Sequence, residues 1–298
     1  MLFDTHTHLC DERYDADREQ IIADFAKNNV GRIVEIGANV DEAKLAVALA
    51  NSHENVYATV GTHPYYCKDF TEESLETLRR LALSNPKVVA VGEAGLDYHD
   101  NHHEYKDAQI KAFELQIKLA LELGLPLIVH VRDAYEDCLA LLKKYYSTKA
   151  DDIRPYNVNE SSRKTVGSTI SRPHLEEPHS SLNPESCPLS PGIIHCFSGD
   201  RAFMEEITAM GFHVAFGGAL TYSNADNIKE AAKHAPLDKI LIETDCPYLV
   251  PAGIHDSRNE PKYVSKVAEL LAELKGLTTQ EIEDITYKNA CRLFKLGD

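Results

Sequence analysis

The sequence lacks the long apolar segments that would place it in a membrane. No run of about 18 or more apolar residues occurs, so we predict no transmembrane helix and no membrane partner. The N-terminal residues also lack a basic region followed by an apolar stretch, which is the pattern of a secretory signal. We therefore expect a cytoplasmic location, or a nuclear one in a eukaryotic cell.

Positive charge is also scarce. The chain carries 31 Lys and Arg against 47 Asp and Glu, which gives a formal net charge of −16. A protein that coats nucleic acid through a broad basic surface needs the opposite balance, so this class is disfavoured. The charge does not exclude an enzyme that draws phosphate into a cleft with metal ions.

Paired cysteine motifs are missing as well. Seven cysteines are scattered along the chain without a C-x-x-C motif, and their number is odd. This pattern is more typical of reduced thiols in a cytosolic protein than of a disulfide framework. Cys196 and Cys246 adjoin candidate metal ligands, and we interpret both as packing residues.

The chain does contain short β-rich apolar runs that alternate with segments of helical spacing. The predicted strands span residues 2–6, 31–37, 56–61, 87–93, 126–131, 192–196, 212–217 and 239–245. The predicted helices span residues 15–29, 40–53, 71–84, 104–124, 133–146, 200–210, 224–235, 261–275 and 278–294. This alternation predicts an α/β fold, a (β/α)8 TIM barrel with eight parallel strands. A doubly wound open sheet is the alternative, but no G-x-G-x-x-G motif follows the first strand.

One segment interrupts the alternation. Residues 147–191 hold nine serines and six of the 13 prolines, and the apolar periodicity disappears there. We interpret this segment as a long, flexible insertion before the sixth strand. Residues 1–298 are then a single barrel domain with one insertion, and we expect the protein to be a monomer.

Histidines and carboxylates gather where the predicted strands end. Only 14 of the 298 residues are histidine, yet four of the eight strand ends carry one. Since these ends converge on one mouth of a barrel, their side chains should meet. A lone histidine there would usually be structural, but a full set would crowd polar groups together without partners unless a metal binds them. The candidates are His6, His8, His63, Glu93, His130, His195 and Asp245.

The candidate ligands divide into two groups. We expect His6, His8 and Asp245 to hold one metal ion, and His130 and His195 to hold a second. Side chains at i and i+2 of a strand point to the same face, so the first two histidines can aim at one point. Mixed imidazole and carboxylate ligands favour divalent transition metals such as Zn or Mn, and Mg is not excluded.

Carboxylates provide the remaining chemistry of the predicted site. Glu93 has two oxygens and could bridge two ions held about 3.5–4 Å apart, an arrangement that activates water for hydrolysis of a phosphodiester or acyl bond. Asp245 could also orient the attacking water and take its proton. Glu243 lies two residues earlier on the same strand, and it either orients a metal ligand from behind or forms a buried salt bridge.

Three further residues are candidates for contact with substrate. His63 lies one strand away from the metal ligands and is better placed to contact a substrate phosphate than to bind a metal. Arg132 and Arg258 could each grip a phosphate through paired hydrogen bonds, or each could form a structural ion pair.

Six segments, taken in order, resemble one protein family. They are DTHTHL, GTHP, GEAGLDY, VHVRDA, HCFSG and ETDCPYL with the later RNEP, and they run from residue 4 to about residue 261. Each motif is short, but the ordered series is similar to the TatD-like metal-dependent deoxyribonucleases of the amidohydrolase superfamily. Many amidohydrolases bridge their metals with a modified lysine at the end of the fourth strand, and Glu93 at this position favours the TatD-like branch.

The resemblance implies a TIM-barrel hydrolase that cleaves DNA with divalent metal ions, typically as a 3′→5′ exonuclease in DNA repair or degradation. Its substrate would be single-stranded DNA or 3′ ends. Asp245, Glu93 and His63 would be its catalytic residues. The metal ligands that it implies are His6, His8, Glu93, His130, His195 and Asp245.

Two other functions are compatible with the sequence. A hydrolase of the same architecture could cleave an acyl bond, for example to remove D-amino acids from tRNA, and the acidic charge suits this alternative. A catalytically silent metal-binding barrel could instead bind a partner through the 147–191 segment. The complete ligand set argues against the silent barrel, because a degraded site would be expected to have lost a ligand.

Overall fold

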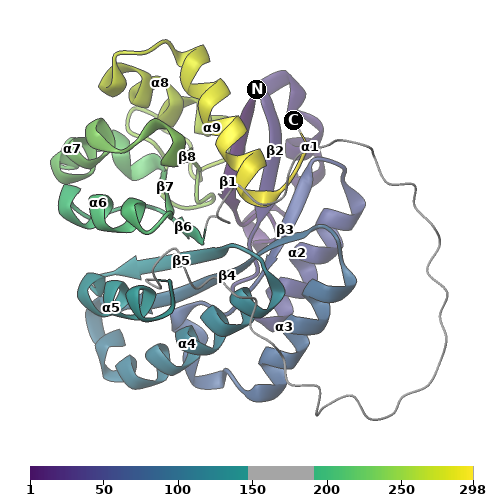
Figure 1. Ribbon diagram of the computed structural model, residues 1–298. Helices are drawn as coiled ribbons and strands as arrows, with labels where there is room; N and C mark the ends of the chain where they lie inside the picture. Colours follow the sequence, from purple (N-terminus) through teal and green to yellow (C-terminus); the bar gives the residue numbers. More distant parts are fainter. Residues whose placement is uncertain (147–190, 298) are drawn as a thin grey trace, which may run out of the picture. The chain divides into compact units, whose positions relative to one another are not determined.

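The protein is described here by a computed structural model, which covers residues 1–146 and 191–297. Within these residues a parallel sheet of eight strands runs in the order β1 to β8 (Figure 1). The strands are β1 Leu2–Thr7, β2 Val30–Glu35, β3 Val56–Val60, β4 Val88–Asp97, β5 Leu127–Arg132, β6 Gly192–Ile194, β7 His213–Phe216 and β8 Ile240–Ile242. The strands are buried almost throughout, which explains why they are near-continuous apolar runs in the sequence.

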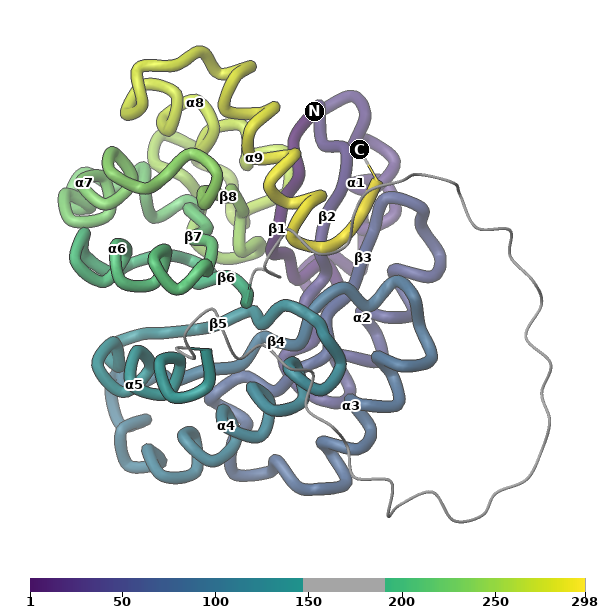
Figure 2. Tube along the Cα trace, in the orientation of Figure 1, coloured from purple at the N-terminus to yellow at the C-terminus, as the bar shows by residue number. Residues whose placement is uncertain are grey.

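The ring of strands closes where β1 meets the segment after β8. Thr7 and Cys246 form an isolated parallel bridge. The backbone N–H of Asp245 donates to the carbonyl of His6 at 3.0 Å, and the N–H of His8 donates to the carbonyl of Cys246 at 2.8 Å. The chain thus passes around the ring in sequence order (Figure 2), and the predicted (β/α)8 barrel is confirmed.

Helices connect the strands and close the chain. In the described residues they are α1 Arg18–Ala23, α2 Val40–Ser52, α3 Glu72–Ser84, α4 Lys106–Leu123, α5 Tyr135–Tyr146, α6 Arg201–Ala209, α7 Asp226–His234, α8 Val264–Lys275 and α9 Thr279–Phe294. Their ends follow capping chemistry: Thr278 and Glu281 form a capping box before α9, and Gly276 ends α8 in the left-handed conformation.

The first predicted helix is the least accurate of the set. The prediction covers residues 15–29, whereas α1 ends at Ala23 and a short 3-10 turn, Ala26–Asn28, follows it. Asn29 then adopts a φ of 60°, a left-handed conformation that asparagine tolerates well. This tight turn brings the chain into β2 at the next residue, so a continuous helix to residue 29 is wrong.

The barrel interior is filled by side chains. One apolar cluster takes a residue from almost every strand and is completed by α9, which lies beside β1 and β8 (Figure 1). Its members include Phe3, Val34, Val89, Ile128, Ile193, Ala215, Leu241, Leu293 and Phe294. This apolar cluster fills one end of the barrel, and polar side chains lie at the other end, where the strands finish, as is usual in this fold.

β4 departs most from the predicted strands. The prediction ends it at Glu93, but the strand continues to Asp97. Its register against β5 shifts between Val91 and Ala94, and Gly95 has a φ of 151°. A Cβ on Gly95 would lie 1.9 Å from the carbonyl oxygen of His130, so only glycine allows the two strands to approach there. Glu93 therefore lies inside the strand, with Asp97 at its end.

Other predictions meet the limits of the described residues. The predicted insertion, apart from Pro191, lies outside them, as does Cys187. The six cysteines that are described form no disulfide with one another; four of them, including Cys246, are buried, whereas Cys196 is partly exposed. Among the described helices, none is long and apolar enough to cross a membrane.

A buried histidine away from the mouth should make folding stability depend on pH. Burial, aided by the charge of Lys239, lowers the pKa of His213 on β7 to about 4. The unfolded chain takes up this proton near pH 6.5 and the folded protein does not, so stability should fall as the pH drops from 6.5 towards 4. The loss should approach about 3 kcal/mol. We expect His213→Gln to flatten this part of the pH–stability curve in urea unfolding; an unchanged curve would contradict the assignment.

Candidate metal centre

Glu93 lies at the centre of the strand-end histidines and faces two sets of them with its two oxygens. Its Oε1 is 2.8 Å from Nδ1 of His130 and 2.9 Å from Nε2 of His195. Its Oε2 is 3.4 Å from Nε2 of His6 and 3.9 Å from Nε2 of His8. One carboxylate oxygen thus points to each of the two ligand groups.

The first group is completed by Asp245. Its Oδ1 lies 3.6 Å from Nε2 of His6 and 3.4 Å from Nε2 of His8. The two Nε2 atoms are themselves 3.2 Å apart. His6 lies on β1 and His8 directly follows its end, and residues two apart on extended backbone point to the same side. Nitrogen and carboxylate oxygen atoms therefore surround one small volume.

The second group is oriented by two carboxylates from behind. Asp97 Oδ2 lies 2.9 Å from Nε2 of His130, so Nδ1 of that ring faces Glu93. Glu243 Oε1 lies 3.3 Å from Nδ1 of His195, which leaves Nε2 of that ring towards Glu93. Both carboxylates are completely or almost completely buried. Each imidazole thus presents one nitrogen to the site while a carboxylate faces the other, an arrangement common among metal-binding histidines.

Asp97 belongs to the candidate site but is absent from the residues predicted from the sequence. The predicted strand ends at Glu93, so the prediction places Asp97 in no strand or helix. On an extended strand, residues four apart point to the same face, and the spacing of Glu93 and Asp97 could have revealed the second carboxylate.

Glu35 and Asp4 were also missed, and both hold the loops that carry the ligands. The buried Glu35 on β2 accepts hydrogen bonds from the backbone N–H groups of Leu9 at 2.8 Å and Cys10 at 2.7 Å. Asp4 accepts a hydrogen bond from the hydroxyl of Thr244 at 2.6 Å. These contacts fix the chain directly after His8 and directly before Asp245.

His63 reaches the same cluster but with a different hydrogen-bonding role. Its Nδ1 accepts the backbone N–H of Tyr65 at 3.1 Å, so the proton of the neutral ring is on Nε2. Nε2 lies 3.5 Å from Oε1 of Glu93. Burial lowers the pKa of His63 to about 3, which keeps the ring neutral. In this tautomer His63 is a hydrogen-bond donor, although it also belongs to a group with Glu93 and His130 whose spacing could hold a metal ion.

The two candidate arginines lie in different surroundings. Arg132 is exposed at the end of β5 and, among the described residues, has no carboxylate within ion-pair distance. Arg258 pairs with Asp17 and with Glu260, and its guanidinium lies 4.4 Å from the ring centre of Tyr14. This network corresponds to the structural ion pair, one of the two roles expected for Arg258.

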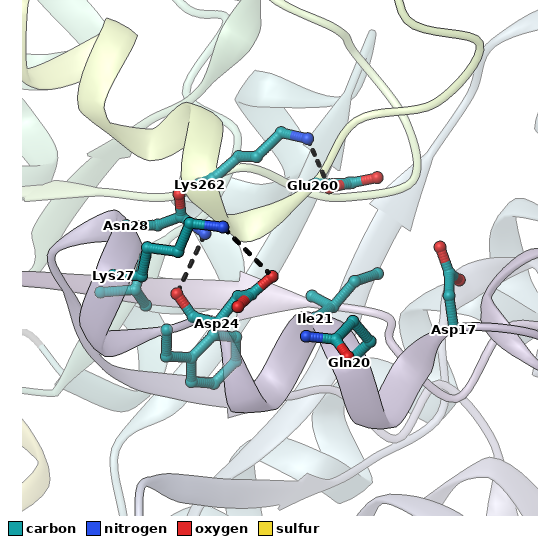
Figure 3. A pocket seen from close by; sticks show the side chains of 10 residues that line it. Asp17, Gln20, Ile21, Asp24, Lys27, Asn28, Glu260 and Lys262 are labelled. Atoms are coloured by element: carbon teal, nitrogen blue, oxygen red, sulfur yellow. Dashed lines mark hydrogen bonds and ion pairs between the residues drawn. The ribbon is translucent and has the colours of Figure 1, made fainter.

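The ion pairs of Arg258 border a cavity that is separate from the metal centre. The cavity has a volume of about 260 Å3 and is lined by α1 and the chain around Glu260 and Lys262 (Figure 3). Lys262 pairs with Glu260 at 2.8 Å, and Lys27 pairs with Asp24 at 3.9 Å. None of the strand-end histidines lines it.

The charges of the centre fit divalent cations. Burial opposes ionisation of Glu93, but the surrounding imidazoles outweigh it and hold the pKa of this carboxyl well below its usual range. Conversely, burial disfavours the charged form of His8, but the Asp245 carboxylate outweighs it and raises the pKa of His8 to about 9. Protons on imidazoles thus balance the carboxylates, and a bound cation would supply the same positive charge. The residues of both groups therefore fit a metal ion.

We expect Asp97→Asn to weaken metal binding at the second group. The amide cannot hold His130 as the carboxylate does, and loss of such a partner costs about 10–100-fold in metal affinity. Titration of the metal-free protein with Zn²⁺ or Mn²⁺ would measure the change in affinity, and excess metal should restore full occupancy. Asp41→Asn on the exposed start of α2 is the matched control. Unaltered metal affinity in Asp97→Asn would contradict the orienting role.

Comparison with known proteins places the chain among similar sequences along its whole length. A model of the family described as TatD related DNase matches residues 3–295. An uncharacterized metal-dependent hydrolase, YabD, from Bacillus subtilis is 40% identical, with 100% of both chains covered. The 3′-5′ ssDNA/RNA exonuclease TatD of Erwinia amylovora is 29% identical over 99% of this chain and 100% of its own length.

Solved structures show the same architecture. YjjV, a TatD homologue from Escherichia coli K12, has a TM-score of 0.81 and 26% identity, covering 99% of this chain and 98% of its own. An uncharacterized amidohydrolase from Saccharomyces cerevisiae has a TM-score of 0.78 at 19% identity, covering 98% of this chain and 99% of its own, a likeness of fold alone.

Proposed function

This chain belongs to the TatD-related DNase family of metal-dependent hydrolases, and we propose that it is a deoxyribonuclease that shortens single-stranded DNA from the 3′ end. The observation that carries the proposal is the position of Glu93, with one oxygen towards each ligand group. A carboxylate placed in this way suits a site for two divalent ions. The name of the Erwinia amylovora relative, an exonuclease of single-stranded DNA and RNA, supports the choice of substrate.

The chemistry divides between the metal ions and the side chains. Two divalent ions bound there would activate water and neutralise charge on the attacking and leaving oxygens of a phosphodiester. Asp245 is placed to accept the proton of the attacking water, since its carboxylate faces the first group and is partly exposed. His63 offers an N–H from Nε2 to a phosphate oxygen at the other side of the centre. Arg132, exposed at the same mouth, is suited to a neighbouring phosphate.

The test uses a 5′-labelled single-stranded oligonucleotide with Mg²⁺, Mn²⁺, Zn²⁺ or EDTA. We expect a ladder of products shortened stepwise from the 3′ end, which EDTA and the His6→Ala/His8→Ala double variant abolish. A metal-loaded wild-type protein that leaves the oligonucleotide intact would overturn the proposal. Release of the amino acid from D-aminoacyl-tRNA in a parallel assay would then assign the centre to acyl hydrolysis.

A further inference from the structure

Aromatic side chains on the described surface gather at the metal centre. Three aromatic residues there are more than one-third exposed, Tyr65 at 48%, Tyr66 at 41% and Tyr248 at 48%. Two follow β3 in the segment after His63, and the third follows β8 three residues after Asp245. The remaining described phenylalanines and tyrosines are buried or half-buried, so exposed aromatic surface is concentrated beside the site.

Tyr65 and Tyr248 lie at opposite ends of the row of imidazoles. The ring of Tyr65 meets that of His63 edge-on, with centroids 4.5 Å apart. The ring of Tyr248 meets that of His8 in the same way, with centroids 6.0 Å apart. Because His63 belongs to the side of His130 and His8 lies with Asp245, the two tyrosines bracket the metal centre.

Both rings are exposed and yet held in place. The guanidinium of Arg13 lies 4.6 Å from the ring centre of Tyr248 and is itself fixed by two hydrogen bonds of 2.7 Å to Asp11. The ring of Tyr65 packs on that of His102, with centroids 4.1 Å apart. A fixed aromatic ring that faces water is suited to bind a flat ligand by stacking. The side chain loses little conformational entropy on binding, because its neighbours already hold it in place.

The electrostatics leave a role for such platforms. Proteins that bind nucleic acid usually gain affinity from lysines and arginines on phosphates, but this chain has a net charge of −16. Arg13 and Arg258 are both engaged by carboxylates. Arg132 is then the arginine of the mouth that remains for a phosphate, so contacts other than those of lysine and arginine should add to the affinity. Base stacking on aromatic rings is such a contact, and it tolerates any base sequence.

We propose that Tyr65 and Tyr248 are the base-stacking platforms of the site, receiving the two nucleobases that flank the phosphate held at the metal centre. This inference rests on the proposed nuclease function, which it deepens by specifying a single-stranded substrate with unpaired bases. Paired bases in a duplex keep their faces stacked on one another, so they cannot occupy either ring. Tyr66, whose hydroxyl bonds to Glu42 at 3.4 Å, extends the same aromatic rim.

The test measures binding separately from cleavage. The metal-loaded protein is titrated with a short, 5′-fluorescein-labelled oligodeoxyadenylate carrying phosphorothioate linkages, and with the same backbone lacking bases. We expect Tyr65→Ala and Tyr248→Ala each to weaken binding of the base-bearing strand about tenfold relative to the wild type. Binding of the abasic strand should be the same in the variants and the wild type. Tyr65→Phe and Tyr248→Phe keep the aromatic ring and should bind the base-bearing strand as the wild type does. Leu83→Ala, at an exposed position on α3, is the control for a change of surface side chain.

Each outcome bears on a different claim. Equal losses on both strands, or no loss on either, would overturn the stacking role. Base-dependent binding without cleavage of an unmodified strand would retain the platforms and overturn the nuclease proposal. Cleavage of the unmodified strand without base-dependent binding would retain the nuclease proposal and overturn the stacking role. Because both tyrosines are exposed, the alanine variants should fold, and their thermal unfolding and metal content verify it.

Discussion

Glu93→Gln should lower both the metal content and the hydrolytic rate of this protein. The amide keeps the size of the side chain but loses its charge, and one of its two ends becomes a donor that repels a cation. Each oxygen of Glu93 faces imidazole nitrogens of a different ligand group. The amide of the variant has only one oxygen, so it could not offer a ligand atom to both groups. We expect the bound metal to fall below the wild-type content and the hydrolytic rate to fall by about 10³-fold.

Metal analysis after dialysis and single-turnover cleavage would measure these two effects. Glu73→Gln, in the exposed first turn of α3, is a matched control that changes the same chemical group away from the site. Full metal content together with wild-type cleavage in Glu93→Gln would contradict the bridging role. Loss of metal content without loss of rate would show that one ion suffices.

Asp245→Asn should separate proton transfer from folding. Asp245 adopts a φ of 57°, a left-handed conformation that asparagine accepts as readily as aspartate, so the backbone should be undisturbed. The amide oxygen can still face His6 and His8, but the side chain can no longer accept a proton from water. We expect kcat to fall by about 10²–10⁴-fold with a much smaller change in KM.

Steady-state kinetics at saturating metal would test this expectation, with melting temperature as the check on folding. Asp41→Asn, on a side chain that is 88% exposed, is again the matched control. A variant with wild-type kcat would contradict the assignment of Asp245 as the proton acceptor. A rise in KM alone would assign Asp245 to substrate binding.

The histidines show why the strand ends could be interpreted before the fold was known. His6 and His8, His130 and His195 each follow an apolar run, and parallel strands in a barrel must end at one mouth. The alternation of apolar runs and amphipathic helices therefore placed these side chains together without any contact being visible. Local order was sufficient because strand direction and side-chain alternation are properties of the backbone itself.

Asp97 shows where such interpretation fails. Whether β4 ends at Glu93 or continues to Asp97 depends on the shifted register against β5, which the close approach of Gly95 to His130 permits. The predicted end of α1 is wrong for a related reason, because the turn that leads into the next strand determines where the helix ends. These features arise from contacts between distant segments, which propensity does not encode.

The sequence by itself determined the barrel, the order of its strands and the residue types that meet at its mouth. These follow from hydrophobic periodicity and from the covalent geometry of strands. Tertiary structure alone decided that each oxygen of Glu93 faces a different group, that Asp97 and Glu243 lie behind His130 and His195, and that Arg258 forms ion pairs with Asp17 and Glu260. The physical reason is that the contacts of a carboxylate depend on its distance from each partner and on its burial. Both are defined only once the strands have packed.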